Sequence, residues 1–156
     1  MPDSGSKNTI PDLRSVEGRV TLMGRIPKFS ALAPSDLAVL AGQASVRSLS
    51  PGVEVYVDGT GADSFAILVT GTITKRGLLN KRPIGSNSVI GTLPLLRRNE
   101  RLRRRTASLL TLTDAILLDI PYRALDRLLP ERRDAFLDSV AEEALNLIEK
   151  LEHSDS

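Results

Sequence analysis

Residues 53–75 read VEVYVDGTGADSFAILVTGTITK, and this stretch decides the fold. It holds three short runs rich in β-branched and aromatic residues, at 53–57, 65–69 and 73–75, separated by segments that contain glycine. Runs of about five residues, interrupted at this interval, are typical of antiparallel rolls and sandwiches. The stretch therefore predicts three consecutive strands joined by tight turns.

The same pattern continues on both sides of this stretch. Further runs of this kind predict strands at 46–49, 106–111 and 115–120. Glycine and proline separate the runs, at Pro51-Gly52, Gly71, Gly77 and Gly85. The predicted fold class is therefore mainly β with flanking helices, built as an antiparallel β-roll or jelly roll with N-terminal helices and a C-terminal hinge and long helix.

Helices are predicted at both ends of the roll. Residues 16–23 form one short helix, and a second begins at Pro34, because proline suits a first helical turn. After the last strand, a hinge at 121–130 precedes a long helix over 131–151. The predicted parts, in chain order, are a flexible leader at 1–12, the roll with its N-terminal helices at 13–129, a C-terminal helix at 130–152 and a tail at 153–156.

The run IGTLPLL at 90–96, with RTA at 105–107, has the layout of a phosphate-binding site. A glycine precedes a short helical turn, and the start of such a turn offers unpaired backbone N–H groups together with the positive end of a dipole. Arg105, expected to open the next strand, can clamp a phosphate with its planar fork of donors. The sequence thus predicts a one-phosphate ligand inside the roll.

Composition argues against several other classes of function. The chain has no cysteine and a single histidine, His153, so neither a histidine-based metal site nor a catalytic triad is expected. No apolar run approaches the ~18–20 residues of a membrane span. The start lacks the basic and apolar regions of a signal peptide, and the absence of cysteine fits the cytoplasm. We expect a cytoplasmic protein that is not an enzyme, with no catalytic residues, metal or cofactor.

Charge is distributed unevenly along the chain. The formal net charge of the whole chain is +2. Residues 81–105 carry eight Lys and Arg against one Glu, whereas residues 106–156 carry five against eleven Asp and Glu. The molecule is therefore bipolar, with a basic central segment followed by an acidic C-terminal part.

Five arginines lie within the eight residues before Arg105: Arg97, Arg98, Arg101, Arg103 and Arg104. One interpretation is an anion-binding loop for a second phosphate, nucleic acid, an anionic lipid or an acidic protein partner; the other is a solvated charged loop. DNA is disfavoured because aromatic residues make up 3% of the chain and tryptophan is absent, so bases would find few stacking partners. We also expect no helix-turn-helix after the long helix.

The long helix at 131–151 has an unusually wide apolar face. At ~100° per residue, its apolar side chains fill about half of the helix circumference, whereas a surface helix needs only a stripe ~100° wide. One interpretation is two burial partners, the roll on one side and the same helix of a second copy on the other. The other is a groove of its own domain. The first interpretation predicts a homodimer formed through helix 131–151.

The order of these elements resembles that of the cyclic-nucleotide-binding domain family, over roughly residues 25–150. The resemblance rests on several segments beside the glycine turn. These are FSAL at 29–32, before the first helix of the family; PGVEV at 51–55, as its first turn and strand; the next turn at 58–59; FAILVTG at 65–71, as its most recognisable strand; and 115–120, as its last strand before the hinge.

The resemblance implies that cAMP or cGMP is the ligand. The residues that it assigns to the ligand are Gly91, Thr92, Leu93, Arg105, Thr106 and Ala107. Two positions depart from the family pattern. Thr92 stands where members usually have a glutamate that accepts a hydrogen bond from the ribose 2′-hydroxyl. Pro94 stands where a small residue commonly presents its N–H, and proline has none.

These departures leave three interpretations open. A hydrogen bond to a charged group is worth roughly 1.5–3 kcal/mol, so losing two contacts predicts binding that is ~10²–10⁴-fold weaker. In the first interpretation the pocket binds a cyclic mononucleotide, in the second it binds a different phosphorylated ligand, and in the third the fold is retained with an empty pocket. The predicted function is a non-enzymatic regulatory module that senses a cyclic nucleotide and signals through its C-terminal helix. The alternative is a ligand-independent adaptor that binds a protein through its arginines or its apolar helix.

Overall fold

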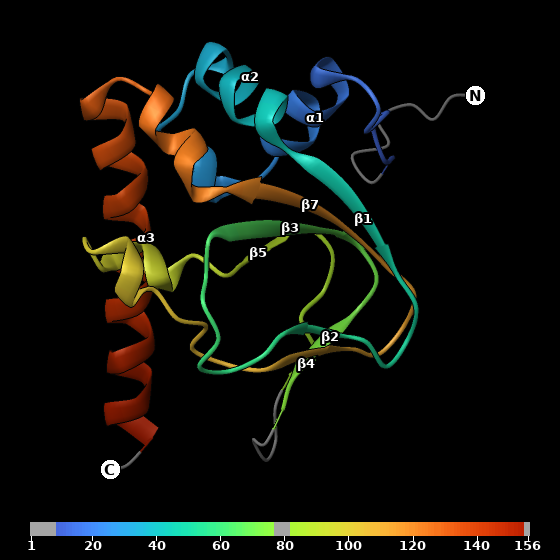
Figure 1. Cartoon of the computed structure of the whole chain (residues 1–156), viewed down its shortest axis with the longest axis vertical. Helices are drawn as coiled ribbons and strands as arrows, with labels where there is room; N and C mark the ends of the chain where they lie inside the picture. The colour runs from blue at the N-terminus through green and yellow to red at the C-terminus, as the bar shows by residue number, and fades with distance from the viewer. Residues whose placement is uncertain (1–8, 77–81, 155–156) are drawn as a thin grey trace.

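The computed structural model describes residues 9–76 and 82–154, which form a β-roll flanked by helices (Figure 1). All strand pairs are antiparallel. The larger sheet has the order β1 (Ser45–Leu49), β7 (Ala115–Pro121), β3 (Ser64–Thr70) and β5 (Ser88–Ile90). The smaller sheet has the order β2 (Glu54–Tyr56), β6 (Leu109–Thr111) and β4 (Ile73–Lys75). The predicted fold class is confirmed.

Strand β3 lies inside the larger sheet and is buried on both faces. Phe65, Ile67 and Val69 belong to the core shared with the helices, whereas Ala66 and Leu68 belong to the core between the two sheets. Successive side chains of a strand point to opposite faces. Because both faces are covered, this strand is a continuous apolar run rather than an alternating one.

The helices on the outer face of the larger sheet begin where the sequence predicts. α1 spans Val16–Met23, and the hydroxyl of Ser15 accepts a hydrogen bond from the N–H of Gly18 at its start. α2 spans Pro34–Gln43, and the carboxylate of Asp36 accepts from the N–H of Ala33. Such caps satisfy N–H groups that a helix leaves unpaired. The short 3-10 helix η1 (Pro27–Phe29) connects the two.

The long helix α3 (Pro130–Ser154) lies along one side of the roll (Figure 1). The 3-10 helix η4 (Tyr122–Arg127) connects it to β7. Phe136 anchors it: its ring lies 5.6 Å from the ring of Phe29 and 5.6 Å from that of Phe65, measured between centroids. These are the only three phenylalanines in the chain, and together they join α3 to η1 and β3.

The second half of α3 leaves its apolar residues exposed. Phe136 and Val140 are fully buried, whereas Leu145 is 58% and Ile148 52% exposed. The wide apolar face therefore divides along the helix into a part that packs on its own domain and a part that does not. Among the described residues, no helix combines the length and the apolarity that crossing a bilayer requires.

Several predicted boundaries are wrong. The strand expected at 106–111 is β6, which begins only at Leu109, because the backbone of Arg105 pairs with the turn before β3: its N–H donates to the carbonyl of Thr60. Arg105 therefore does not open a strand. Strand β5 was not predicted, since its three residues offer too short a pattern. Helix α3 begins at Pro130, the first residue of the C-terminal helix predicted at 130–152.

The predicted ends of the chain are only partly described. Helix α3 continues to Ser154, so the tail predicted at 153–156 begins too early. Residues 1–8 of the predicted leader, the predicted break at Gly77 and the last two residues of the tail lie outside the described residues.

Candidate functional site

The cassette turn, residues 91–95, follows β5 directly. Gly91 has a φ of +83°, a conformation that glycine adopts without strain. A Cβ atom on Gly91 would lie 2.7 Å from Tyr56 Oη and 2.8 Å from an Arg105 guanidinium nitrogen. The 3-10 helix η2 (Leu93–Leu96) follows, with Pro94 in its first turn. Both the backbone conformation and the close packing therefore require glycine at this position.

The structure brings the six predicted ligand-binding residues together around one cavity of about 170 Å³, which we call the ligand cavity. These six are Gly91, Thr92, Leu93, Arg105, Thr106 and Ala107. Helix α3 contributes Glu143 and Leu147 to the same wall, and β2 contributes Tyr56. The cavity is smaller than the ~300–1,000 Å³ usual for small-molecule sites. Any larger ligand must therefore displace part of this wall.

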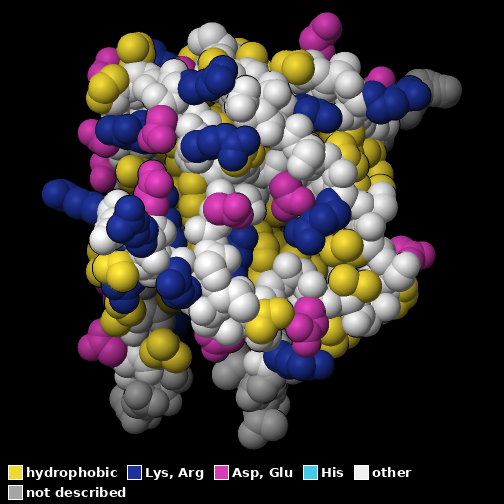
Figure 2. Space-filling model, viewed as in Figure 1, with side chains coloured by type: hydrophobic (Ala, Val, Ile, Leu, Met, Phe, Trp, Pro, Cys, Tyr) yellow, Lys and Arg dark blue, Asp and Glu magenta, His cyan; other side chains and the backbone are white. Residues whose placement is uncertain are grey.

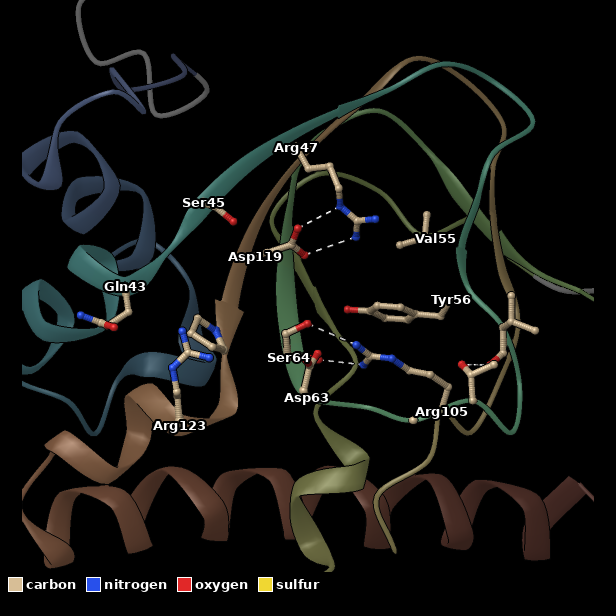
Figure 3. A pocket seen from close by; sticks show the side chains of 14 residues that line it. Gln43, Ser45, Arg47, Val55, Tyr56, Asp63, Ser64, Arg105, Asp119 and Arg123 are labelled. Atoms are coloured by element: carbon tan, nitrogen blue, oxygen red, sulfur yellow. Dashed lines mark hydrogen bonds and ion pairs between the residues drawn. The ribbon is translucent and has the colours of Figure 1, made fainter. Parts of the chain in front are cut away.

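Arg105 is buried and is held by neighbours inside the roll (Figure 3). One terminal nitrogen donates to the carbonyl oxygen of Ser64 across 2.7 Å, and the other donates to the Ser64 hydroxyl across 3.2 Å. The guanidinium carbon lies 3.6 Å from the centroid of the Tyr56 ring, in a cation–π contact. The side chain is thus fixed across the roll, and β3 holds its donors.

Both tyrosines of the chain meet Arg105. The hydroxyl of Tyr122 accepts from a terminal nitrogen of Arg105 at 3.5 Å and donates to the carbonyl of Gly91 at 2.5 Å. The buried hydroxyl of Tyr56 has no hydrogen-bond partner among the described residues. Burial raises the pKa of Tyr56 above its ordinary range and raises that of Tyr122 to about 12, and the positive charge of Arg105 opposes both shifts.

A second cavity, of about 740 Å³, lies on the other side of this pair, and Tyr56 and Arg105 line both cavities. Figure 3 shows its side chains, including the ion pair between Arg47 and Asp119, whose closest atoms are 2.9 Å apart. The Tyr56–Arg105 pair therefore forms the partition between the two cavities. A movement of the guanidinium away from Ser64 would change the shape of both.

Glu143 links α3 to the cassette turn. Its carboxylate accepts from the hydroxyl of Thr92 at 3.4 Å and forms an ion pair with Lys28 of η1 at 2.9 Å. The side chain of Lys28 is only 11% exposed. Glu143 therefore belongs to the contact between α3 and the rest of the domain. Its charge is neutralised by a nearly buried lysine beside the ligand cavity.

Comparison of the sequence alone with protein-family models and with curated proteins gives no match. Solved structures do match. The regulatory subunit of a cAMP-independent protein kinase A from Trypanosoma brucei superposes with a TM-score of 0.73 at 17% identity, over 97% of this chain and 52% of that one. The chain has the fold of a cyclic-nucleotide-binding domain.

Two other solved structures support the same assignment of the fold. The regulatory domain of Toxoplasma gondii protein kinase A, crystallised with cAMP, matches with a TM-score of 0.66 at 13% identity, over 83% of this chain and 51% of that one. The sensor domain of the transcriptional regulator DNR from Pseudomonas aeruginosa matches with a TM-score of 0.60 at 16% identity, over 89% of both chains. The domain spans about half the length of the two kinase regulatory structures.

The ligand cavity is not lined by any of the five arginines within residues 97–104. They belong to what we call the arginine segment, residues 97–104, which contains the 3-10 helix η3 (Glu100–Leu102). Arg97, Arg98, Arg101 and Arg104 are exposed, and Arg103 is half-buried with its guanidinium 5.4 Å from the centroid of the Tyr122 ring. The structure therefore separates the predicted site residues into two groups.

Four residues that line the ligand cavity or hold Arg105 were not predicted as site residues from the sequence: Tyr56, Ser64, Tyr122 and Glu143. In the sequence, the two tyrosines resemble ordinary apolar residues of the segments that form β2 and η4. Ser64 resembles a polar residue at the start of a strand. Glu143 falls on the polar side of the helical wheel. The only sequence signal was the scarcity of tyrosine: the chain has two, and both are buried beside Arg105.

Proposed function

We propose that this chain is a non-enzymatic regulatory module that binds a cyclic mononucleotide, cAMP or cGMP, in the ligand cavity and transmits binding through α3. The main support for the proposal is that the cassette turn, Arg105 and two side chains of α3 line the same cavity. The cyclic phosphate docks at the start of η2, where backbone N–H groups and the helix dipole favour an anion.

Arg105 supplies the positive charge for this phosphate. Its donors are held by a neutral carbonyl and a neutral hydroxyl of Ser64. The donor is charged in both cases, but a phosphate acceptor is charged as well, and its attraction to the guanidinium exceeds that of the neutral Ser64 oxygens. The ligand therefore draws the guanidinium from Ser64 toward the cassette turn, and the binding energy is reduced by the cost of breaking the existing contacts.

Glu143 offers an acceptor for the ribose of the ligand. The family pattern places a carboxylate at the position of Thr92, and here the carboxylate of Glu143 lies 3.4 Å from the Thr92 hydroxyl. Lys28 balances its charge, so it repels a nearby phosphate less than a free carboxylate would. A ribose hydroxyl bound to Glu143 connects the ligand directly to α3.

Signalling follows from the small size of the ligand cavity. A nucleotide needs more room than about 170 Å³, and the part of the wall that α3 contributes is Glu143 and Leu147. A ligand changes a conformational equilibrium only by the difference between its affinities for the two states. A nucleotide favours the position of α3 that widens the cavity, and the hinge at 121–130 accommodates the change.

Isothermal titration of the purified chain with cAMP and with cGMP tests the proposal. We expect micromolar binding of one of them and loss of that binding in Arg105→Ala. Because Arg105 is buried and bonded, a second variant is needed that does not disturb the core. Thr106 is exposed and lines the cavity, so Thr106→Glu places a negative charge beside the phosphate, and Thr106→Gln is the matched neutral control.

We expect Thr106→Glu to show no heat of nucleotide binding, whereas Thr106→Gln should show most of the heat of the unmodified chain. Absence of heat from the unmodified chain at millimolar cAMP and cGMP would contradict the proposal. Equal binding by both Thr106 variants would place the ligand elsewhere than on the cassette turn.

The proposed module acts as a homodimer formed through helix 131–151. Support comes from the second half of α3, where Leu145 and Ile148 are more than half exposed. Large apolar side chains gathered on one face mark interaction sites. Light scattering after size-exclusion chromatography is expected to give twice the chain mass, and Leu145→Glu with Ile148→Glu is expected to give the monomer. A monomeric unmodified chain at micromolar concentration would overturn this part.

A further inference from the structure

We propose that the arginine segment and the groove beside it bind an acidic peptide of a partner protein. Figure 2 shows Lys and Arg side chains gathered over the segment that carries η2 and η3. Within the described ranges, none of its five arginines lies within ion-pair distance of a carboxylate. The five arginines therefore carry positive charges that no ion pair among the described residues neutralises.

The arginine segment has a defined backbone. The side chain of Asn99 accepts from the N–H of Arg101 at the start of η3. Arg103 donates to the carbonyl of Arg97 across 3.1 Å, and Arg104 donates to the carbonyl of Arg101 across 2.9 Å. These bonds fix the backbone, while the guanidinium groups of Arg97, Arg98 and Arg101 extend from it without recorded partners in the described part of the chain. A fixed backbone lowers the entropy that ordering would cost on binding.

A groove of about 750 Å³ lies between the arginine segment, η4 and the first half of α3. Its apolar lining includes Leu95, Leu125 and Leu137. Its walls carry both signs of charge. The arginines are Arg98, Arg103, Arg123 and Arg133, and the carboxylates are Glu100, Asp126, Asp134 and Asp138. The groove can therefore take an apolar side chain between charged walls.

This mixture of charges identifies the class of partner. A nucleic acid presents a continuous row of phosphates, which the four carboxylates of the groove would repel, and its bases need aromatic rings to stack on. The one tyrosine of the groove, Tyr122, is buried beneath Arg103. A peptide avoids both problems, because its acidic side chains can contact the exposed arginines while an apolar side chain enters the groove.

Fluorescence anisotropy tests the proposal with a labelled peptide in which pairs of glutamates alternate with single leucines. No cyclic nucleotide is added, so the result does not depend on the proposed ligand. The test variant combines Arg97→Ala, Arg98→Ala and Arg101→Ala, whose side chains hold no backbone group of the segment. The matched control combines Arg14→Ala, Arg82→Ala and Arg127→Ala, which removes the same number of positive charges at exposed positions outside the groove.

We expect the test variant to bind the peptide about tenfold more weakly, since each exposed ion pair contributes ~0–1 kcal/mol. The control should bind as the unmodified chain does. Replacing the leucines of the peptide by glutamines should also weaken binding, because the groove then has no apolar side chain to receive.

Four results would overturn the proposal. The first two are equal binding of a peptide with glutamine in place of glutamate, and equal binding by the test variant. The third is tighter binding of a single-stranded oligonucleotide of the same charge, which would assign the surface to nucleic acid. The fourth is conversion of a dimer to a monomer by the test variant alone, which would show that a second copy of the chain covers the arginines.

Discussion

The hydroxyl of Tyr122 donates a hydrogen bond to the carbonyl of Gly91 across 2.5 Å. Tyr122 begins η4 in the hinge, and Gly91 begins the cassette turn. The same hydroxyl accepts from Arg105. A single side chain therefore connects η4, the element before α3, to both parts of the candidate phosphate site.

Replacing Tyr122 by phenylalanine removes this connection without changing the packing of the ring. We expect the free energy of unfolding to fall by about 1 kcal/mol, because the partly buried Gly91 carbonyl loses its partner. Urea unfolding measures the change. Tyr56→Phe is the matched control: the Tyr56 hydroxyl has no partner in the described part of the chain, so its removal should leave stability unchanged or raise it. Equal losses in both variants would contradict the assigned bond.

Gly91→Ala tests how tightly the cassette turn is packed. Gly91 and Gly52 have nearly the same φ, +83° and +80°, but a Cβ on Gly52 meets no atom within 4 Å. Both substitutions carry the strain of a positive φ, which is roughly 1–2 kcal/mol. Only Gly91→Ala adds a collision with Tyr56 and Arg105, so it should be the more destabilising in thermal unfolding. A smaller loss of thermal stability in Gly91→Ala than in Gly52→Ala would mean that the Tyr56 and Arg105 side chains move aside at little cost.

Glu143→Gln tests the role of α3 in ligand binding. If Glu143 accepts from the ribose, the variant should weaken cAMP or cGMP binding about tenfold, the value expected when a hydrogen bond to a charged group becomes neutral. Its exposed neighbour supplies the control, because Glu142→Gln should leave affinity unchanged. Tighter binding by Glu143→Gln, measured by titration calorimetry, would show instead that repulsion of the phosphate dominates.

The two tyrosines make stability depend on pH in the alkaline range. In the unfolded chain both ionise near 10.0, whereas burial raises the pKa of Tyr122 to about 12 and raises that of Tyr56 as well. The unfolded state therefore loses protons first. The stabilisation is fully present below about pH 10 and is lost as pH rises toward 12.

Urea unfolding across this range measures the loss. Lysines titrate there too, so the decisive quantity is the difference between the unmodified chain and the double variant Tyr56→Phe, Tyr122→Phe. The variant should show a shallower decline. Parallel declines would contradict the raised pKa values.

Much of the fold could be predicted because its signals are local. The first helix was predicted at 16–23 and α1 spans the same residues. The unbroken run at 65–69 corresponds to β3, the strand that is buried on both faces. Strand β5 failed because three residues carry almost no periodicity. Its position depends on pairing with β3, which lies twenty residues earlier in the chain.

Most of the strands, the helices and the glycine turn follow from the sequence, because each depends on side chains that are neighbours in the chain. The residues that hold Arg105 and that reach the turn are fixed instead by contacts between distant segments. Ser64 is 41 residues from Arg105, and Glu143 is 51 residues from Thr92. Such contacts form when both sheets and α3 pack around one core, and no local pattern records them. The candidate cassette was therefore visible in the sequence, while its connections to β3, the hinge and α3 were not.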